Sequence, residues 1–245
     1  MHISISAEAV FHFLGFPVTN SLIATWVTII ILTSAAILIN LGIKLSPNSF
    51  QNFVEGIVET LLDLVNSVAG EKGRRFFPLV ATFFLFIITA NWLGLLPGFG
   101  SVGFYKLKEG HEVFVPLFRG ATADLNTTLA LALFSVGAIQ YFGLSTLRLP
   151  YLRRFFNFKS PIEAFVGLLE LISDFAKIIS FAFRLFGNIF AGEVLLVVIS
   201  SLIPILAPLP FYGLELFVGF IQALVFAMLT LVFLNVATVG HGENA

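Results

Sequence analysis

The segment SPIEAFVGLLELISDFAKIISFAFRLFGNIFAGEVLLVVISSLI, residues 160–203, decides the fold of this chain. It opens with Ser160, Pro161 and Glu163, which supply an N-cap, a proline at the first helical position and the glutamate of a capping box. Roughly 43 helical residues extend about 64 Å, which is about twice the hydrocarbon thickness of a bilayer. We therefore expect one long helix that tilts steeply, bends or protrudes from the membrane.

A second long apolar segment follows this helix. Three prolines between residues 204 and 210 interrupt the pattern, and they predict a break before a last helix from about Tyr212 to Thr238. Together, residues 160–238 are expected to form a long, tilted helix hairpin.

The composition of the chain is that of a membrane protein. Of its 245 residues 58% are hydrophobic and 11% are charged, and the mean hydropathy is +1.00. We therefore predict an all-α polytopic membrane protein that forms a single integral domain over residues 1–245. The net charge of -1 gives no electrostatic argument for nucleic acid as a partner. Without cysteine, and with four scattered histidines, the sequence predicts no metal site and no cofactor.

The remaining spans lie before residue 160, so that about five membrane helices are expected in all. Residues 1–20 form an outer segment without the pattern of a cleaved signal peptide. The glycine-rich stretch from Gly98 to Asp124 is expected to be an exposed loop between two spans that occupy residues 76–147. The three predicted spans are residues 21–45, Phe76 to about Leu96, and about Asn126 to Leu147.

Residues 48–69 have a different, amphipathic pattern. They follow Ser46-Pro47, a pair suited to the start of a helix, and carry one polar stripe at helical spacing. We expect this helix to lie along the membrane surface, the alternative being a helix in a soluble loop. The stripe consists of Asn52, Glu55, Glu59, Asp63 and Asn66.

Lysine and arginine counts in the loops predict the orientation. With the N-terminus outside, eight basic residues are cytoplasmic and three are external, and this excess favours a cytoplasmic C-terminus. The cytoplasmic set is Lys44, Lys72, Arg74, Arg75, Arg148, Arg153, Arg154 and Lys159, and the external set is Lys106, Lys108 and Arg119.

Arg184 lies in the middle of the long apolar helix. A guanidinium keeps its charge at any workable pH, and at bilayer depth it costs about 2.5–3.5 kcal/mol on the lenient insertion scale. It lies on a polar face of this helix, whose members recur at helical spacing. They are Glu163, Glu170, Asp174, Lys177, Arg184 and Asn188.

Two acids, Glu193 and Glu215, stand apart from that face. Glu193 is half a turn around from Arg184, and Glu215 shares a face of the last helix with Gln222. An acid can exchange a proton in hydrocarbon, whereas an arginine cannot. The pattern therefore predicts water access at the acids and an electrostatic barrier at Arg184.

Five short motifs, in this order and at these distances, resemble subunit a of the F-type ATP synthases. The resemblance covers about Ser46 to Thr238. Its motifs are Asn91-Trp-Leu-Gly-Leu-Leu-Pro97, Ala123-Asp-Leu-Asn-Thr-Thr-Leu129, Arg184-Leu-Phe-Gly-Asn188, Ala191-Gly-Glu193 and Gln222-Ala223.

The resemblance implies a stator in the lipid bilayer beside a rotating ring of c subunits, with peripheral-stalk b subunits as further partners. Two proton half-channels would meet the ring, and nucleotide chemistry would belong to other subunits, so no catalytic residue is expected here. Arg184 resembles the arginine that faces the ring, and Asn188 and Gln222 resemble its polar neighbours. Glu193 and Glu215 resemble acids of the outer half-channel, although some relatives have histidine at the second position.

Four further residues are candidates for lining a channel. Asp124 and Asn126 lie where the family has polar groups, whereas Asp174 and Lys177 are better explained as a solvated or paired set at the cytoplasmic edge. Plainer explanations also exist for Arg184, as a structural counter-ion, and for Asn188 and Gln222, as hydrogen-bonding contacts between helices.

The chief alternative function is a secondary ion transporter with an intramembrane charge pair, although no internal repeat of the Arg184 segment is present. For the coupling ion, H⁺ is the default over Na⁺. A bacterial plasma membrane fits better than an organelle.

Overall fold

The computed structural model describes residues 7–13, 15–44, 48–96, 98–100, 102–108, 111–153, 155, 160–203 and 206–239. Five of its helical segments are long and apolar enough to cross a membrane, which confirms the predicted all-α polytopic class. These segments are Asn20–Gly42, Ser49–Gly94, Leu125–Leu147, Pro161–Leu202 and Pro208–Thr238.

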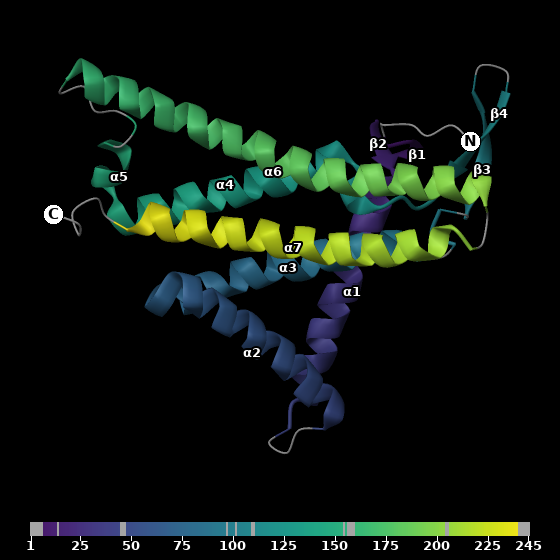
Figure 1. Cartoon of the computed structure of the whole chain (residues 1–245), viewed down its shortest axis with the longest axis horizontal. Helices are drawn as coiled ribbons and strands as arrows, with labels where there is room; N and C mark the ends of the chain where they lie inside the picture. Colours follow the sequence, from purple (N-terminus) through teal and green to yellow (C-terminus); the bar gives the residue numbers. More distant parts are fainter. Residues whose placement is uncertain are drawn as a thin grey trace.

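Four helices run along the long axis of the molecule and form its core (Figure 1). They are α3 (Gly73–Gly94), α4 (Leu125–Leu147), α6 (Pro161–Leu202) and α7 (Pro208–Thr238). α7 packs against α3 and α4, and α6 packs chiefly against α4. The side chains of Phe76, Ile87, Leu185 and Leu231 are fully buried between them. The N-terminal part of α6 diverges from α7, so this part lies outside the core (Figure 1).

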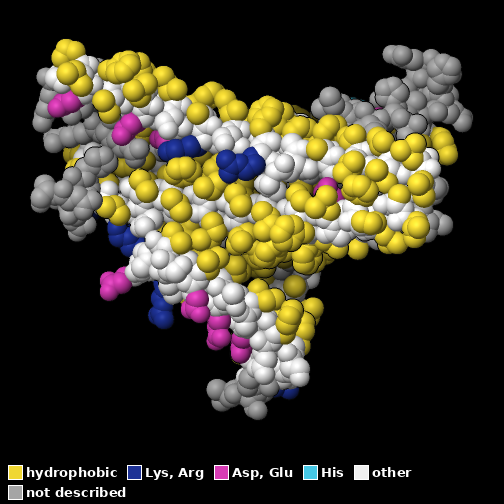
Figure 2. Space-filling view, in the orientation of Figure 1, with side chains coloured by type: hydrophobic (Ala, Val, Ile, Leu, Met, Phe, Trp, Pro, Cys, Tyr) yellow, Lys and Arg dark blue, Asp and Glu magenta, His cyan; other side chains and the backbone are white. Residues whose placement is uncertain are grey.

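The first two helices stand away from the bundle. α1 (Asn20–Gly42) crosses it steeply and contacts α3, and α2 (Ser49–Ala69) returns to α3 through the short turn η1 (Gly70–Lys72) (Figure 1). α2 occupies the range where the amphipathic pattern predicts a helix, and acidic side chains line one edge of it (Figure 2). Asn48 caps α2, while the predicted start at Ser46-Pro47 lies outside the described residues.

Polar side chains at the helix starts explain where several helices begin. Ser160 Oγ accepts a hydrogen bond from the Glu163 amide at 3.2 Å, as the capping box predicts. Asp124 caps α4 by accepting from the Asn126 amide, and Thr19 caps α1 by accepting from the Leu22 amide.

The structure corrects two expectations. The last helix begins at Pro208 and not near Tyr212, because Pro208 and Pro210 occupy its first turn, where a proline sacrifices no helical hydrogen bond. The stretch expected to be a plain loop contains an antiparallel hairpin of β3 (Gly103–Lys108) and β4 (His111–Pro116).

A second hairpin precedes α1. It pairs β1 (Ala9–Phe13) with β2 (Phe16–Thr19) in the segment for which the sequence predicted only an outer position. Both hairpins lie at the same end of the molecule as the turn between α6 and α7 (Figure 1).

Candidate functional site

A cavity of about 500 Å³ lies near the hairpin end of the bundle. Its wall is formed by α3, α6, α7 and the short turn η2 (Ala121–Ala123). The lining includes both predicted acids, Glu193 and Glu215, together with Asn91, Thr122, Ser200 and Tyr212. The structure thus brings the two acids to one cavity, although they come from different helices.

Glu215 enters this cavity beside a glycine. A Cβ atom added at Gly192 would lie far inside van der Waals contact of the Glu215 carboxyl group. The glycine of the Ala191-Gly-Glu193 motif therefore has a steric role, because a side chain at position 192 would overlap the Glu215 carboxyl in its observed position. Glu215 is buried, and within the described part of the chain no hydrogen bond or ion pair is assigned to its carboxyl.

Two side chains of α3 form hydrogen bonds to the backbone of α7 close to Glu215. Asn91 Nδ2 donates to the Gly219 carbonyl oxygen at 2.9 Å, and Trp92 Nε1 donates to the Leu216 carbonyl oxygen at 3.1 Å. Thr122 Oγ1 donates in turn to Asn91 Oδ1 at 2.6 Å. The bonds flank the turn of α7 that follows Glu215, so they fix the position of that acid relative to α3 and η2.

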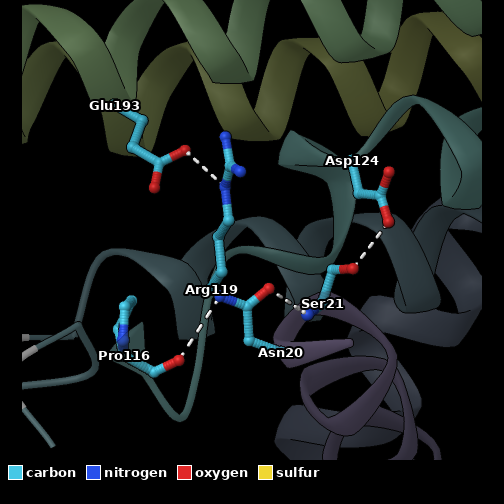
Figure 3. A network of polar contacts seen from close by, with 6 residues as sticks. All are labelled: Asn20, Ser21, Pro116, Arg119, Asp124 and Glu193. Carbon is cyan, nitrogen blue, oxygen red and sulfur yellow. Dashed lines mark hydrogen bonds and ion pairs between the residues drawn. The ribbon is translucent and has the colours of Figure 1, made fainter. Parts of the chain in front are cut away.

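Glu193 is paired with an arginine from outside the helices. The Nε atom of Arg119, in the segment between β4 and η2, lies 3.4 Å from Glu193 Oε2 (Figure 3). The Arg119 side chain is only 7% exposed, whereas that of Glu193 is 37% exposed. The Cζ atom of Arg119 also lies 5.7 Å from the centroid of the Phe190 ring.

Asp124 and Asn126 lie at the start of α4 and not among the residues that line the cavity. Ser21 Oγ donates to Asp124 Oδ2 at 2.6 Å (Figure 3). The backbone amide and the side chain of Asn126 both donate to Asp124 Oδ1. Asp124 is buried and saturated with partners, whereas Asn126 is exposed. In this geometry Asp124 joins α1 to α4.

Arg184 projects from the surface of α6. It is exposed, and its Nη2 atom lies 3.5 Å from Ser180 Oγ one turn earlier. Basic side chains stand in the middle of an otherwise hydrophobic face of α6 and α7 in Figure 2. Arg184 and Gln222 border the same small depression between these two helices, and Asn188 is exposed on the following turn of α6.

Asp174 and Lys177 form a closed polar network nearer the N-terminus of α6. Lys177 Nζ lies 2.6 Å from Asp174 Oδ1, and Gln140 Nε2 donates to Asp174 Oδ2 at 2.7 Å. Tyr151 OH donates to Gln140 Oε1 at 2.7 Å, and Lys177 Nζ lies 4.6 Å from the Phe233 ring centroid. This network connects α4, α5 (Leu149–Arg153), α6 and α7.

The predicted site residues therefore fall into separate groups. Glu193 joins Glu215, Arg184 joins Gln222, and Asp174 joins Lys177, whereas Asp124 and Asn126 stand apart. Among the described residues there is no group of three or more histidine or acidic side chains placed to hold a metal ion.

Sequence reasoning assigned Arg119 only to an external loop. The sequence does contain one indication that Arg119 is special: it is the one charge in the otherwise uncharged stretch VFVPLFRGATA at residues 113–123. A charge in such a stretch requires a partner when the stretch is buried.

One comparison with known proteins bears on these groups. A family model described as ATP synthase A chain matches residues 22–235. The match contains Arg184, Asn188, Glu193, Glu215 and Gln222, and it agrees with the resemblance carried by the sequence motifs.

Proposed function

Because the chain belongs to the ATP synthase A chain family, we propose that it forms the proton half-channels of the membrane sector and couples proton flow to rotation of a c-ring. Membership makes the chain subunit a of an F-type ATP synthase, a multi-pass membrane subunit and not a catalytic one. This family membership also argues against the alternative function, a secondary ion transporter.

The observation that carries this proposal is the separation of the arginine from the acids. Arg184 is exposed on the outer face of α6, whereas Glu193 and Glu215 line an internal cavity. The nine-residue step from Arg184 to Glu193 corresponds to about 14 Å along a helix. The permanent charge is thus open to a neighbouring subunit, while the titratable groups are open to water in the cavity.

The mechanism follows from this separation. A rotor carboxylate that is neutral in lipid loses its proton to the cytoplasmic half-channel as it reaches Arg184, because a nearby cation favours its charged form. It then accepts a proton that has entered through the cavity by way of Glu193 and Glu215, and it returns to lipid in neutral form. Arg184 cannot deliver a proton, so it blocks direct passage between the two half-channels. One elementary charge crossing the membrane potential supplies about 2.3 kcal/mol per 100 mV.

Asn188 and Gln222 are assigned to the surroundings of Arg184 in this mechanism. Gln222 shares the depression beside Arg184, and Asn188 lies on the same exposed face. Both are hydrogen-bonding groups without charge, so they can solvate a passing rotor carboxylate and its arginine partner without trapping either.

The proposal also covers the orientation of the chain, the membrane in which it lies and its partner subunits. The basic residues of the loops favour an external N-terminus and a cytoplasmic C-terminus, and thereby an outer position for the cavity. We assign the chain to a bacterial plasma membrane, with peripheral-stalk b subunits and the c-ring as partners and H⁺ as the coupling ion. α2 is assigned to the membrane surface because one side of it carries Glu55, Glu59 and Asp63 and the other is apolar.

The decisive experiment replaces Arg184 by alanine in the assembled enzyme. ATP-driven proton pumping into inverted membrane vesicles is expected to vanish, while passive proton conductance persists or rises, since the barrier is gone. Phe183→Leu is the matched control, because Phe183 is a 54% exposed neighbour of the arginine and carries no charge. Both variants are compared at equal amounts of assembled complex. An Arg184→Ala enzyme that pumps at the control rate would remove the barrier role and the proposal with it.

A further inference from the structure

Arg119 is buried, although it lies in the connecting segment between the hairpin of β3 and β4 and the turn η2. Its side chain is 7% exposed, and its guanidinium lies between the Glu193 carboxylate and the Phe190 ring. Burying a guanidinium that cannot lose its charge is unfavourable unless a counter-charge compensates. Glu193 supplies that charge, although it lies 74 positions further along the chain.

The segment that carries Arg119 is fastened at both ends to the first turn of α1 (Figure 3). Asn20 Nδ2 donates to the Pro116 carbonyl oxygen at 3.3 Å, and Ser21 Oγ donates to Asp124 Oδ2 at 2.6 Å. Asn20 and Ser21 are themselves buried, with 1% and 0% exposure. Residues 116–124 therefore have a fixed path, and this path sets the position of the Arg119 backbone beside α6.

Arg119 contacts Glu193 without itself lining the cavity. Gly120, Thr122 and Ala123 line the cavity, whereas Arg119 does not. The Nε atom of Arg119 contacts one carboxylate oxygen, and the side chain of Glu193, which lines the cavity, remains 37% exposed. This arrangement orients the acid without closing the cavity in front of it.

We propose that Arg119 is a positioning residue of the proton path, which holds the Glu193 carboxylate toward the cavity from a loop clamped by the first turn of α1. The inference rests on the proposed function, because it requires Glu193 to take part in proton transfer. A merely structural ion pair would stabilise the fold without altering transport through the assembled enzyme. The two roles differ in whether the effect of Arg119 depends on the charge of Glu193.

The test is a double-mutant cycle on passive proton conductance, measured in vesicles stripped of the soluble sector and normalised to the amount of assembled complex. Arg119→Gln is expected to slow conductance about tenfold with native Glu193, and less than about twofold in a Glu193→Gln background. Arg119→Lys keeps a cation over Phe190 and is expected to conduct at least about threefold faster than Arg119→Gln. Arg74→Gln is the control, because Arg74 is an exposed arginine at the start of α3.

Three results would overturn the inference: native conductance in Arg119→Gln, an equal loss in both Glu193 backgrounds, or a lysine variant as slow as the glutamine variant. If Arg119→Gln alone does not assemble, recovery of assembly by Glu193→Gln supports the pairing and continued failure overturns it. Failure of the proposed function looks different, since Glu193→Gln by itself would then conduct at the native rate.

Discussion

Each half of α6 carries a carboxylate, Asp174 in the N-terminal half and Glu193 in the C-terminal half, and the two have opposite surroundings. In the N-terminal half, both oxygens of Asp174 have partners, because Lys177 and Gln140 each contact one of them. In the C-terminal half, the side chain of Glu193 has Arg119 as its partner and is 37% exposed, and Glu215 lines the same cavity with its carboxyl packed against Gly192. A saturated carboxylate stabilises a structure, whereas one that faces a cavity remains free to exchange protons.

The largest expected effect tests the open half of this comparison. Glu193→Gln and Glu215→Gln should each slow proton conductance, and the double variant should reduce it by about a hundredfold, because neutral amides cannot relay protons. If both acids serve one path, the double variant is slower than either single variant but its free energies do not add. Conductance of all three variants, measured in one vesicle preparation, gives the coupling; strict additivity would assign the acids to separate roles.

A smaller effect is expected when the place of the Glu215 carboxyl is filled. Gly192→Ala should slow conductance about tenfold, because its methyl group forces that carboxyl out of position. Gly187→Ala is the matched control in the same helix, since a Cβ atom there meets nothing within 4 Å. The two alanine variants are compared for proton conductance per assembled complex. Equal rates would show that the carboxyl has other productive positions.

The closed half of the comparison predicts a change in stability and not in rate. Asp174→Asn should destabilise the assembled subunit by about 1–3 kcal/mol, because it leaves Lys177 without a counter-charge in a site where that side chain is 19% exposed. Thermal dissociation of the complex in detergent measures this effect, with the exposed Glu163→Gln as control. Conductance per assembled complex should change by less than about twofold. A larger loss of conductance would place Asp174 in the path after all.

The last expected effect concerns the clamp on the Arg119 segment. Ser21→Ala removes one buried hydrogen bond to Asp124 and should cost about 1–3 kcal/mol of stability, because an acceptor is left unsatisfied. Transport should fall by only a few-fold, since Asn20 still holds the other end of the segment. Conductance and thermal dissociation are measured together on this variant. A loss equal to that of Arg119→Gln would mean that Ser21 alone sets the position of the arginine.

Local sequence patterns predicted most of the helices, because their signals lie within a few residues. The capping box at Ser160 and the absence of proline up to position 203 define α6 without reference to the rest of the chain. The same holds for α2, whose amphipathic stripe agrees with its observed range. The start of α7 was missed because a proline can both end one helix and begin the next.

The hairpins and the Arg119 pair were harder to predict for a physical reason. Glycines and charged residues in the segment around β3 and β4 hide the short alternating pattern of the two strands. Neither strand is stable by itself, and each forms by pairing with the other. Arg119 and Glu193 meet only because α1 fixes the path of residues 116–124, and no local pattern encodes a contact 74 positions away. The grouping of Arg184 with Gln222 likewise depends on how α6 packs on α7.

The clamp between α1 and the Arg119 segment also has a consequence for biosynthesis. Ser21 is made before its partner Asp124, which follows 103 positions later, and Glu193 is later still. The contact between Ser21 and Asp124 can form only after residue 124 has reached the membrane, and the pair of Arg119 and Glu193 only after residue 193 has done so. The cavity is therefore complete only after Glu215 has been inserted, so that a chain that stalls before this residue lacks one wall of the cavity.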